Sequence, residues 1–416
     1  AAFMYFLCPN MIAHSSLATT DMTATVFIML SVFCMWDFLE NPRTERALVS
    51  GVTLGLALLS KFTAVFLLPA YILVSFGLFF KYREEERSRF GKAMRTMLFV
   101  VFPAAFFILW AGYLFELRPL LEGAMRASQK EAFFLEFLNK IFPSAGTGLT
   151  DLARKFLYSV PVPLSSFWVG IVGIARHSAE GTRNFFMGSW SAMGNPIYYA
   201  AAFIIKTPIP VVMAFFTGTV LVFTKREKRD LNLYLLFFAV MFFVAASRSN
   251  LQLGLRYVLP AYPMIFVIAA LGMGTLLKGG KILNFLGAAL VVWTAVLHFF
   301  VWPDYLSYFN ELVGGTENGY LYLRDSNLDW GQDLPALKSY MDKNGIKEVR
   351  LVYFGTADPS YYGVKHIDVN EEEREFPQEA VYAVSAQYME SLGWTKHEKV
   401  SATAGGSILI YDMRKK

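Results

Sequence analysis

The sequence predicts a mainly α-helical bundle that crosses a membrane several times and ends in a small α/β domain outside it. Two observations indicate this fold class. Hydrophobic residues make up 55% of the 416 residues and charged residues only 17%, against roughly 25% charged in a soluble domain. Apolar runs of bilayer-spanning length recur through residues 1–302, whereas residues 303–416 carry mixed helix and strand patterns.

Eight apolar segments fit the bundle, since a spanning helix needs about 20 residues. Residues 47–60 form a short segment that is followed directly by residues 62–80. These two make either a tight hairpin that turns at Lys61, which we favour, or one longer helix kinked there. The expected spans are residues 22–38, 47–60, 62–80, 96–115, 207–224, 231–247, 255–277 and 282–302.

Lysine and arginine are distributed unevenly between the loops that join these segments. If residues 22–38 run from outside to inside, the inside loops hold fourteen basic residues and the short outside loops hold three. Basic residues favour the cytoplasmic side, so the loop 116–195 and the tail 303–416 are predicted to be extracytoplasmic. The inside set is Arg43, Arg46, Lys81, Arg83, Arg87, Arg89, Lys92, Arg95, Lys225, Arg226, Lys228, Arg229, Lys278 and Lys281; the outside set is Lys61, Arg248 and Arg256.

The chain is therefore divided into a membrane core, residues 1–302, and an extracytoplasmic α/β domain, residues 303–416. In that domain Asp333 is placed to cap a helix over residues 334–343, which Asn344 and Gly345 end. Strands are expected at residues 348–354, 380–385 and 407–412. The modest net charge of +5 fits a membrane protein with basic inner loops and gives no reason to expect a nucleic-acid partner.

An acidic group precedes the first span at the outer face. Asp21 either caps and complements the dipole of the following helix or acts as a functional carboxylate that binds a metal, a sugar hydroxyl or the acceptor. His14, seven residues earlier, is a weaker candidate for contact with substrate. A divalent metal ion is therefore considered as a cofactor, with no ligand set assigned.

Three cations from distant segments are predicted at the same outer membrane depth. Lys61 lies at the hairpin tip, Lys206 precedes a Thr-Pro pair, and Arg256 begins a span. Each side chain could simply extend toward lipid headgroups. Together they could neutralise a phosphate at the headgroup level and stabilise its departure.

Two further patterns concern a possible calcium loop and the two cysteines. Residues 325–333 alternate oxygen-bearing side chains like a calcium loop, but Trp330 and Ala336 occupy positions where an EF-hand needs Gly and Glu. Turn-forming and capping roles fit these side chains better. The two cysteines, Cys8 and Cys34, are expected to be free thiols because the helix between them separates them too far for a bridge.

The segments HSSLATTD (14–21), GLALLSKFT (55–63), YYAAAFIIKTP (198–208), LGLRYVLP (253–260), SYFNE (307–311) and DSNLDWGQ (325–332) together carry a resemblance. In this order and spacing the chain resembles bacterial and archaeal relatives of the dolichyl-phosphate-mannose protein mannosyltransferases, which are membrane glycosyltransferases of the GT-C class.

The resemblance implies a polyprenyl-phosphate-sugar donor, an active site at the extracytoplasmic face of a prokaryotic cell membrane, and inversion at the anomeric carbon. Asp21 would match the family's second outer-loop acid, the catalytic candidate here. Lys61, Lys206 and Arg256 would bind the donor phosphate, and His14 and Tyr257 complete the substrate-binding set. The family's first outer-loop acid has no counterpart in this sequence, and we expect it upstream of Ala1.

The function predicted is transfer of a mannose-like sugar from the lipid-linked donor to a hydroxyl of a protein, lipid or glycan acceptor. Two alternatives stay open. One is a transporter or lipid flippase, whose ionisable residues would usually lie near the bilayer midplane. The other is a non-catalytic scaffold or sensor that binds a partner through its tail.

Overall fold

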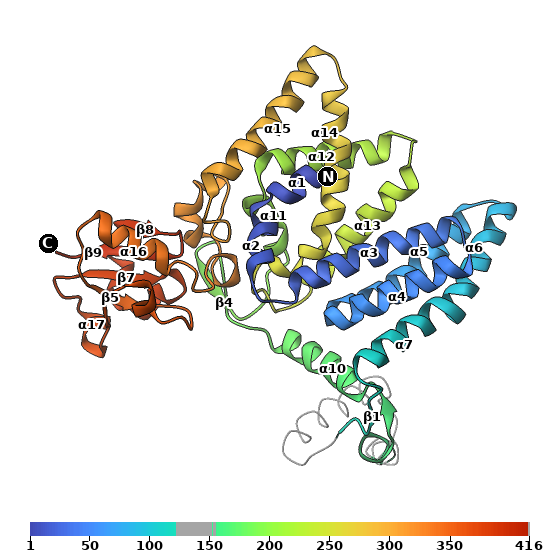
Figure 1. Ribbon diagram of the computed structural model, residues 1–416, viewed down its shortest axis with the longest axis horizontal. Helices are drawn as coiled ribbons and strands as arrows, with labels where there is room; N and C mark the ends of the chain where they lie inside the picture. The colour runs from blue at the N-terminus through green and yellow to red at the C-terminus, as the bar shows by residue number, and fades with distance from the viewer. Residues whose placement is uncertain (122–151, 153–154, 415–416) are drawn as a thin grey trace. The chain divides into compact units, whose positions relative to one another are not determined.

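The computed structural model describes residues 1–121, 152 and 155–414 (Figure 1). The chain divides into two compact units. One unit, here called the tail unit, combines Ala1–Thr19 with Thr182–Lys416; the other, the helical unit, is Thr20–Gly181. Each unit is described by itself. Residues 122–151 and 153–154 of the predicted loop 116–195 lie outside the described residues.

The helical unit is built from long apolar helices. Two of its helical stretches run without a break through changes of helix type: Phe62–Lys81 and Glu86–Gly112. The second begins well before the predicted residue 96 because its charged first turns are also helical. Its elements are α3 (Asp21–Glu40), α4 (Thr44–Ser60), η1 (Phe62–Phe66), α5 (Leu67–Lys81), α6 (Glu84–Thr96), η2 (Met97–Val101), α7 (Phe102–Gly112), β1 (Leu117–Arg118), β2 (Val162–Pro163) and α10 (Ser165–Glu180).

The predicted hairpin at Lys61 is confirmed by the contacts of its two arms with α3. Arg46 near the start of α4 bonds Asp37 near the end of α3 at 2.7 Å, so α4 runs antiparallel to α3. Ser31 and Tyr71 share a hydrogen bond of 2.8 Å, and Lys61 contacts the first residue of α3; α5 therefore runs parallel to α3. The chain reverses at Lys61, whose extended backbone (φ −163°, ψ 138°) ends α4. One kinked helix is excluded.

The tail unit contains the remaining apolar helices. Its closest helix pair is α12 and α14, where Gly218 and Gly272 let each backbone approach the carbonyls of the partner helix; small residues serve this purpose in membrane bundles. The elements are α1 (Ala2–Leu7), α2 (Pro9–Ser16), β3 (Asn184–Phe186), β4 (Ser189–Ser191), α11 (Tyr198–Lys206), α12 (Ile209–Thr224), α13 (Arg229–Ser247), η3 (Leu255–Tyr257), η4 (Leu259–Ala261), α14 (Tyr262–Leu277) and α15 (Lys281–Val301).

Six helices in the described part of the chain are long and apolar enough to cross a membrane. All eight predicted segments are helical, but α12 is a shorter apolar helix of 16 residues and α4 has 17. The number of spans and their orientation stay predictions. Both cysteines are free, as expected.

The C-terminal part of the tail unit folds around a five-stranded sheet of order β6-β5-β7-β9-β8. Strands β6, β5 and β7 are parallel, whereas β9 is antiparallel to β7 and β8. Helix α16 (Leu334–Lys343) buries Leu337 and Met341 in the core of the sheet. The other elements are β5 (Val349–Val352), β6 (His366–Asp368), α17 (Glu371–Glu375), β7 (Val381–Ser385), β8 (Ala402–Ala404), β9 (Ile408–Asp412) and short 3-10 turns η5 to η10 (Glu311–Val313, Thr316–Leu321, Asp325–Asn327, Pro359–Tyr362, Ala386–Ser391 and Gly393–Lys396).

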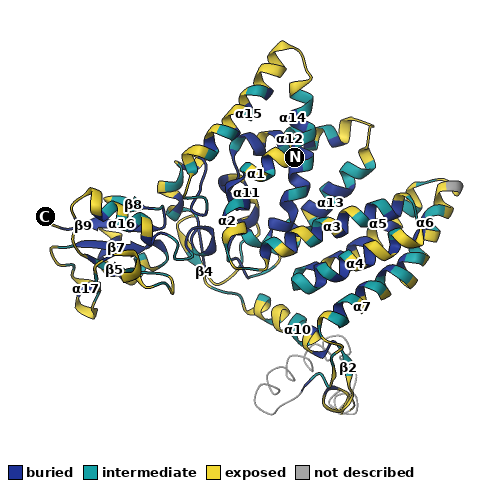
Figure 2. Cartoon of the chain, viewed as in Figure 1, coloured by how far each residue is buried: buried dark blue, intermediate teal, exposed yellow. Residues whose placement is uncertain are grey.

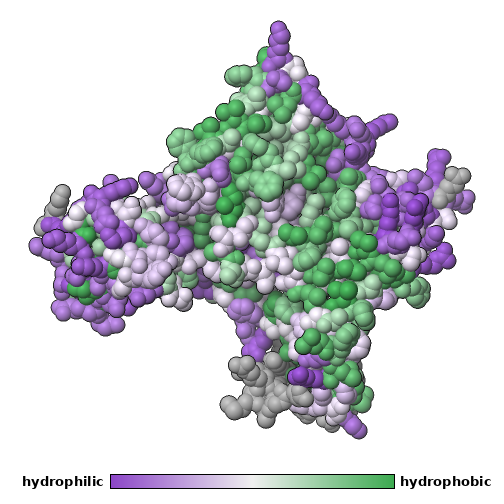
Figure 3. Space-filling view, viewed as in Figure 1, coloured by the Kyte–Doolittle hydropathy of each residue, from purple (hydrophilic) through white to green (hydrophobic). Residues whose placement is uncertain are grey.

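The predicted tail helix and all three predicted strands are confirmed. The expected side-chain cap by Asp333 is wrong: Asp333 occupies the N-cap position, but its carboxylate accepts the backbone N–H of Ser407 at 3.1 Å. Figure 2 shows the dark-blue buried centre of this sheet, where all five residues of β7 are buried. In Figure 3 a hydrophilic surface covers the sheet, whereas α14 and α15 carry a hydrophobic one.

Candidate functional site

In the helical unit, Asp21 and Lys61 form an ion pair. Asp21 is the first residue of α3, after Thr20 at the N-cap position, and its side chain is 4% exposed; that of Lys61 is 18% exposed. The extended backbone at Lys61 places the ammonium against the Asp21 carboxylate. The predicted acid and one predicted phosphate ligand therefore neutralise each other in this structure.

His14 is buried, with 2% exposure, in the last turn of α2 in the tail unit. The same helix is tied to the end of α11, because Asn10 Nδ2 donates to the Lys206 carbonyl at 2.5 Å. Four of the predicted site residues, His14, Lys206, Arg256 and Tyr257, thus belong to the tail unit. Whether they and the Asp21–Lys61 pair share one site stays a prediction.

Lys206 ends α11 and is the most enclosed of the predicted cations, with 1% exposure. Its Nζ donates to the Leu306 carbonyl at 2.9 Å and to the Asn327 carbonyl, and lies 4.3 Å from the centre of the Phe309 ring. Burial lowers the pKa of Lys206 from 10.5 to about 7, because the ammonium loses water. The Lys206 ammonium therefore binds two loop carbonyls in this structure, and its role as a phosphate ligand stays a prediction.

Arg256 lies in the 3-10 turn η3, and its guanidinium stacks on two aromatic rings. Its Cζ is 5.1 Å from the Trp330 ring centre and 5.4 Å from that of Tyr257. Within the described residues its Nε is buried without a hydrogen-bond partner, and its guanidinium has no carboxylate partner. Of the three predicted cations, Arg256 is the one whose charge is not compensated by an acceptor in the described chain.

The turn that carries Arg256 is held by Asn327, which the sequence reasoning did not single out. Asn327 Oδ1 accepts the backbone N–H of Leu255 at 2.9 Å, and its Nδ2 donates to the Tyr198 hydroxyl at 2.8 Å. Its carbonyl accepts the Lys206 ammonium. One asparagine thus joins α11, Lys206 and the Arg256 turn. In the sequence, Asn327 could have been noticed only as a member of the DSNLDWGQ segment.

The segment 325–333 has the turn-forming roles expected of it. Asp329 Oδ1 accepts from the Gly331 N–H at 2.8 Å, and Asp325 Oδ1 from the Ser326 N–H at 2.5 Å. Burial raises the pKa of Asp329 to about 6 and that of Asp333 to about 8. Among the residues described, no group of three or more His, Cys, Asp or Glu side chains could hold a metal ion.

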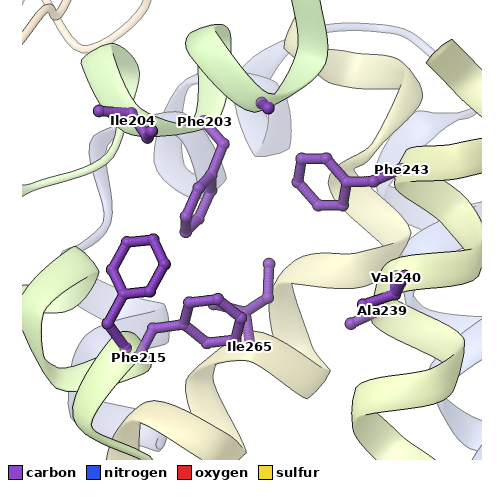
Figure 4. Close-up of a pocket in the computed structure, with 9 residues that line it drawn as sticks. Phe203, Ile204, Phe215, Ala239, Val240, Phe243 and Ile265 are labelled. Atoms are coloured by element: carbon purple, nitrogen blue, oxygen red, sulfur yellow. The ribbon is translucent and has the colours of Figure 1, made fainter. Parts of the chain in front are cut away.

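An apolar cavity of about 250 Å³ lies on the other side of α11 (Figure 4). It is lined by Phe203 and Ile204 of α11, Phe215 of α12, Phe243 of α13 and Ile265 of α14. It is lined entirely by apolar atoms. One side of helix α11 therefore faces the apolar cavity. On another side, Tyr198 and Lys206 bind Asn327, which in turn holds the Arg256 turn.

The fold and this polar site define a helical membrane protein with a cation-bearing turn next to a sheet-containing tail. Residues 1–110 match the model of the dolichyl-phosphate-mannose-protein mannosyltransferase family. This match covers about a quarter of the chain and supports the resemblance to a GT-C, mannosyltransferase-like family of membrane glycosyltransferases. No curated protein and no solved structure matches it.

Proposed function

We propose that this protein transfers a mannose-like sugar from a polyprenyl-phosphate-linked donor to a hydroxyl acceptor at the extracytoplasmic face. The acceptor oxygen attacks the anomeric carbon, the bond from that carbon to the phosphate oxygen breaks, and polyprenyl phosphate leaves with the electron pair. The acceptor proton passes to a carboxylate. A fixed cation at the leaving phosphate lowers the barrier because negative charge develops there.

The observation that carries this proposal is the uncompensated guanidinium of Arg256. Its Nε is buried and lacks an acceptor in the described chain, and the rings of Tyr257 and Trp330 lie beside its guanidinium. An arginine in this state is suited to a phosphate, which it can bind through two parallel hydrogen bonds. Lys61 and Lys206 already have acceptors, so Arg256 is the main phosphate ligand of the proposal.

The apolar cavity supports a lipid-linked donor. Its walls offer hydrocarbon contacts and no hydrogen-bond groups, which suits a prenyl chain or a comparable lipid chain. Asp21 is proposed to orient the acceptor, as the family's second outer-loop acid, once the Lys61 ammonium is displaced or shared. His14 and Tyr257, which both lie in the tail unit, are proposed to bind substrate.

The test is the rate of mannose transfer from polyprenyl-phosphate mannose, measured as release of polyprenyl phosphate in membranes that contain the full-length protein. Arg256→Ala is expected to lower the rate about 100-fold or more, the usual effect of removing a group that stabilises developing charge. Arg256→Lys should retain part of it, because the charge remains while the bidentate geometry is lost.

The matched control is Arg248→Ala, an exposed arginine just after α13, which should transfer at the wild-type rate. An Arg256→Ala variant that folds and transfers normally contradicts the role of Arg256. A wild-type protein that releases no polyprenyl phosphate contradicts the glycosyltransferase proposal and favours the transporter or scaffold alternative.

A further inference from the structure

The loop at residues 325–333 packs directly on the turn that carries Arg256. Asn327 binds the Leu255 N–H at 2.9 Å, and a Cβ added at Gly254 would lie 2.9 Å from Ser326 Oγ and 3.2 Å from the Asn327 nitrogen. Gly254 has φ +124°, a backbone conformation that favours glycine. The two segments are therefore fitted to each other at the level of the backbone.

Trp330 is held firmly in this loop. Its backbone N–H donates to Gln332 Oε1 at 2.8 Å, and Gln332 Nε2 donates to the Leu328 carbonyl at 3.1 Å. The next residue, Gly331, accepts a hydrogen bond from the Tyr353 hydroxyl and has φ +78°. The indole is thus placed by a defined turn.

Several hydrogen-bond donors in this small region have no acceptor within the described chain. They are the Arg256 Nε–H, the Trp330 Nε1–H and the Ser326 hydroxyl, the last on a residue 3% exposed. A buried donor left unpaired is costly because it loses its hydrogen bonds to water, so such a group of donors is unusual unless a ligand supplies the acceptors. An anion with several oxygens would satisfy them together.

We propose that Trp330 is a second ligand of the phosphate at Arg256, its indole N–H binding a phosphoryl oxygen while its ring supports the guanidinium. This inference rests on the proposed function for the identity of the anion, the phosphate of a lipid donor or product. The Ser326 hydroxyl lies against the same turn and is available to a third oxygen. The tail loop thus contributes directly to substrate binding.

The alternative is that Trp330 acts only as a stacking surface for Arg256. Trp330→Phe separates the two roles, because phenylalanine keeps an aromatic face and removes the N–H. Trp330→Ala removes both. If the indole N–H binds phosphate, Trp330→Phe weakens binding of the phosphate-bearing lipid and leaves binding of the phosphate-free lipid unchanged.

The experiment measures binding of polyprenyl phosphate, polyprenol and inorganic phosphate to the full-length protein in lipid nanodiscs. Trp330→Phe is expected to weaken polyprenyl phosphate about tenfold, the effect of losing one hydrogen bond to a charged oxygen. Polyprenol should bind as to the wild type. Inorganic phosphate, if it occupies the same site, should lose affinity by a similar factor to polyprenyl phosphate. That result would show that Trp330 binds the phosphate group and not the prenyl chain.

The control is Trp293→Phe, on α15, whose indole lies 3.4 Å from Glu311; it should leave all three affinities unchanged. A variant that loses polyprenol and polyprenyl phosphate equally has lost its fold rather than a phosphate contact, and the ratio of the two affinities corrects for this.

Wild-type affinity in Trp330→Phe, with weakened binding in Arg256→Ala, overturns the inference and leaves the proposed function intact. Weakened phosphate binding in Trp330→Phe in a protein that transfers no sugar overturns the proposed function and supports the phosphate site.

Discussion

The two lysines predicted to bind phosphate are compensated in different ways in the two units. In the helical unit Lys61 meets a carboxylate, Asp21, and its side chain keeps 18% exposure. In the tail unit Lys206 is enclosed at 1% exposure and meets backbone carbonyls of Leu306 and Asn327. One charge is balanced by an opposite charge and the other by dipoles.

The difference teaches what a cation near a membrane face can do. A lysine that pairs with a carboxylate can exchange that partner for an anionic ligand. A lysine enclosed by backbone carbonyls supports the structure, because moving it takes a donor away from both acceptors. Arg256 differs from both lysines, because its guanidinium lies against two aromatic rings and its buried Nε has no acceptor in the described chain. It is therefore the cation best suited to bind an anionic ligand.

The strongest test of this comparison is Lys206→Met. The substitution leaves the Leu306 and Asn327 carbonyls without their donor, and we expect the free energy of unfolding to fall by about 3 kcal/mol. Thermal unfolding of the purified protein in detergent measures it. Lys225→Met is the control: this exposed lysine at the end of α12 donates to Thr275 at 3.1 Å, and its loss should cost less than about 0.5 kcal/mol.

The pH dependence is the second readout of the same substitution. Burial lowers the pKa of Lys206 from 10.5 to about 7, so the unfolded chain binds more protons between these values. Stability from this group therefore rises as the pH increases from 7 toward 10. Lys206→Met should abolish that rise. A slope that persists unchanged in the variant would contradict the buried, easily deprotonated lysine.

The next test sharpens the other side of the comparison, through a double-mutant cycle of Asp21→Asn and Lys61→Met. Lys61→Met should destabilise more than Asp21→Asn, because it leaves a carboxylate of 4% exposure without its cation. We expect a coupling energy of about 2 kcal/mol. The matched pair is Asp37–Arg46, whose side chains are 45% and 36% exposed and should couple by less than about 1 kcal/mol. Equal coupling in both pairs would refute the distinction.

The helices and the tail sheet were predictable because their signals are local. Apolar runs gave the helical segments, and the hairpin at Lys61 followed from a polar residue between two such runs. In the tail, the apolar strand segments and the Asn344–Gly345 helix end gave the predicted helix and all three predicted strands. Each of these depends on residues within about twenty positions of one another.

The partners of the site residues were not predictable for the opposite reason. Lys206 binds carbonyls 100 and 121 residues later in the chain, and a backbone carbonyl has no signature in a sequence. Trp330 reaches Arg256 from 74 positions away. The sequence indicated which residues carry charge, but the compensation of each charge depends on tertiary contacts.

The last test is Asp333→Asn, which concerns a buried carboxylate in place of a buried lysine. Asp333 is 5% exposed, and its side chain accepts the Ser407 N–H at 3.1 Å. Burial raises the pKa of Asp333 from 3.8 to about 8. The folded protein therefore binds more protons than the unfolded chain between these values, and the stability from this group falls as the pH rises from 4 to 8.

Asparagine is neutral and keeps an oxygen for the Ser407 N–H, so Asp333→Asn should match the wild type at pH 4 and exceed it increasingly as the pH rises to 8. The difference should grow steadily between pH 4 and 8, a range that includes the pKa of Asp329, which burial raises to about 6. Asp368→Asn, at an exposed position of β6, should change stability by less than about 0.5 kcal/mol at either pH. A variant less stable than the wild type at pH 8 would show that dipoles alone sustain the Asp333 charge, and that a buried carboxylate here needs no proton.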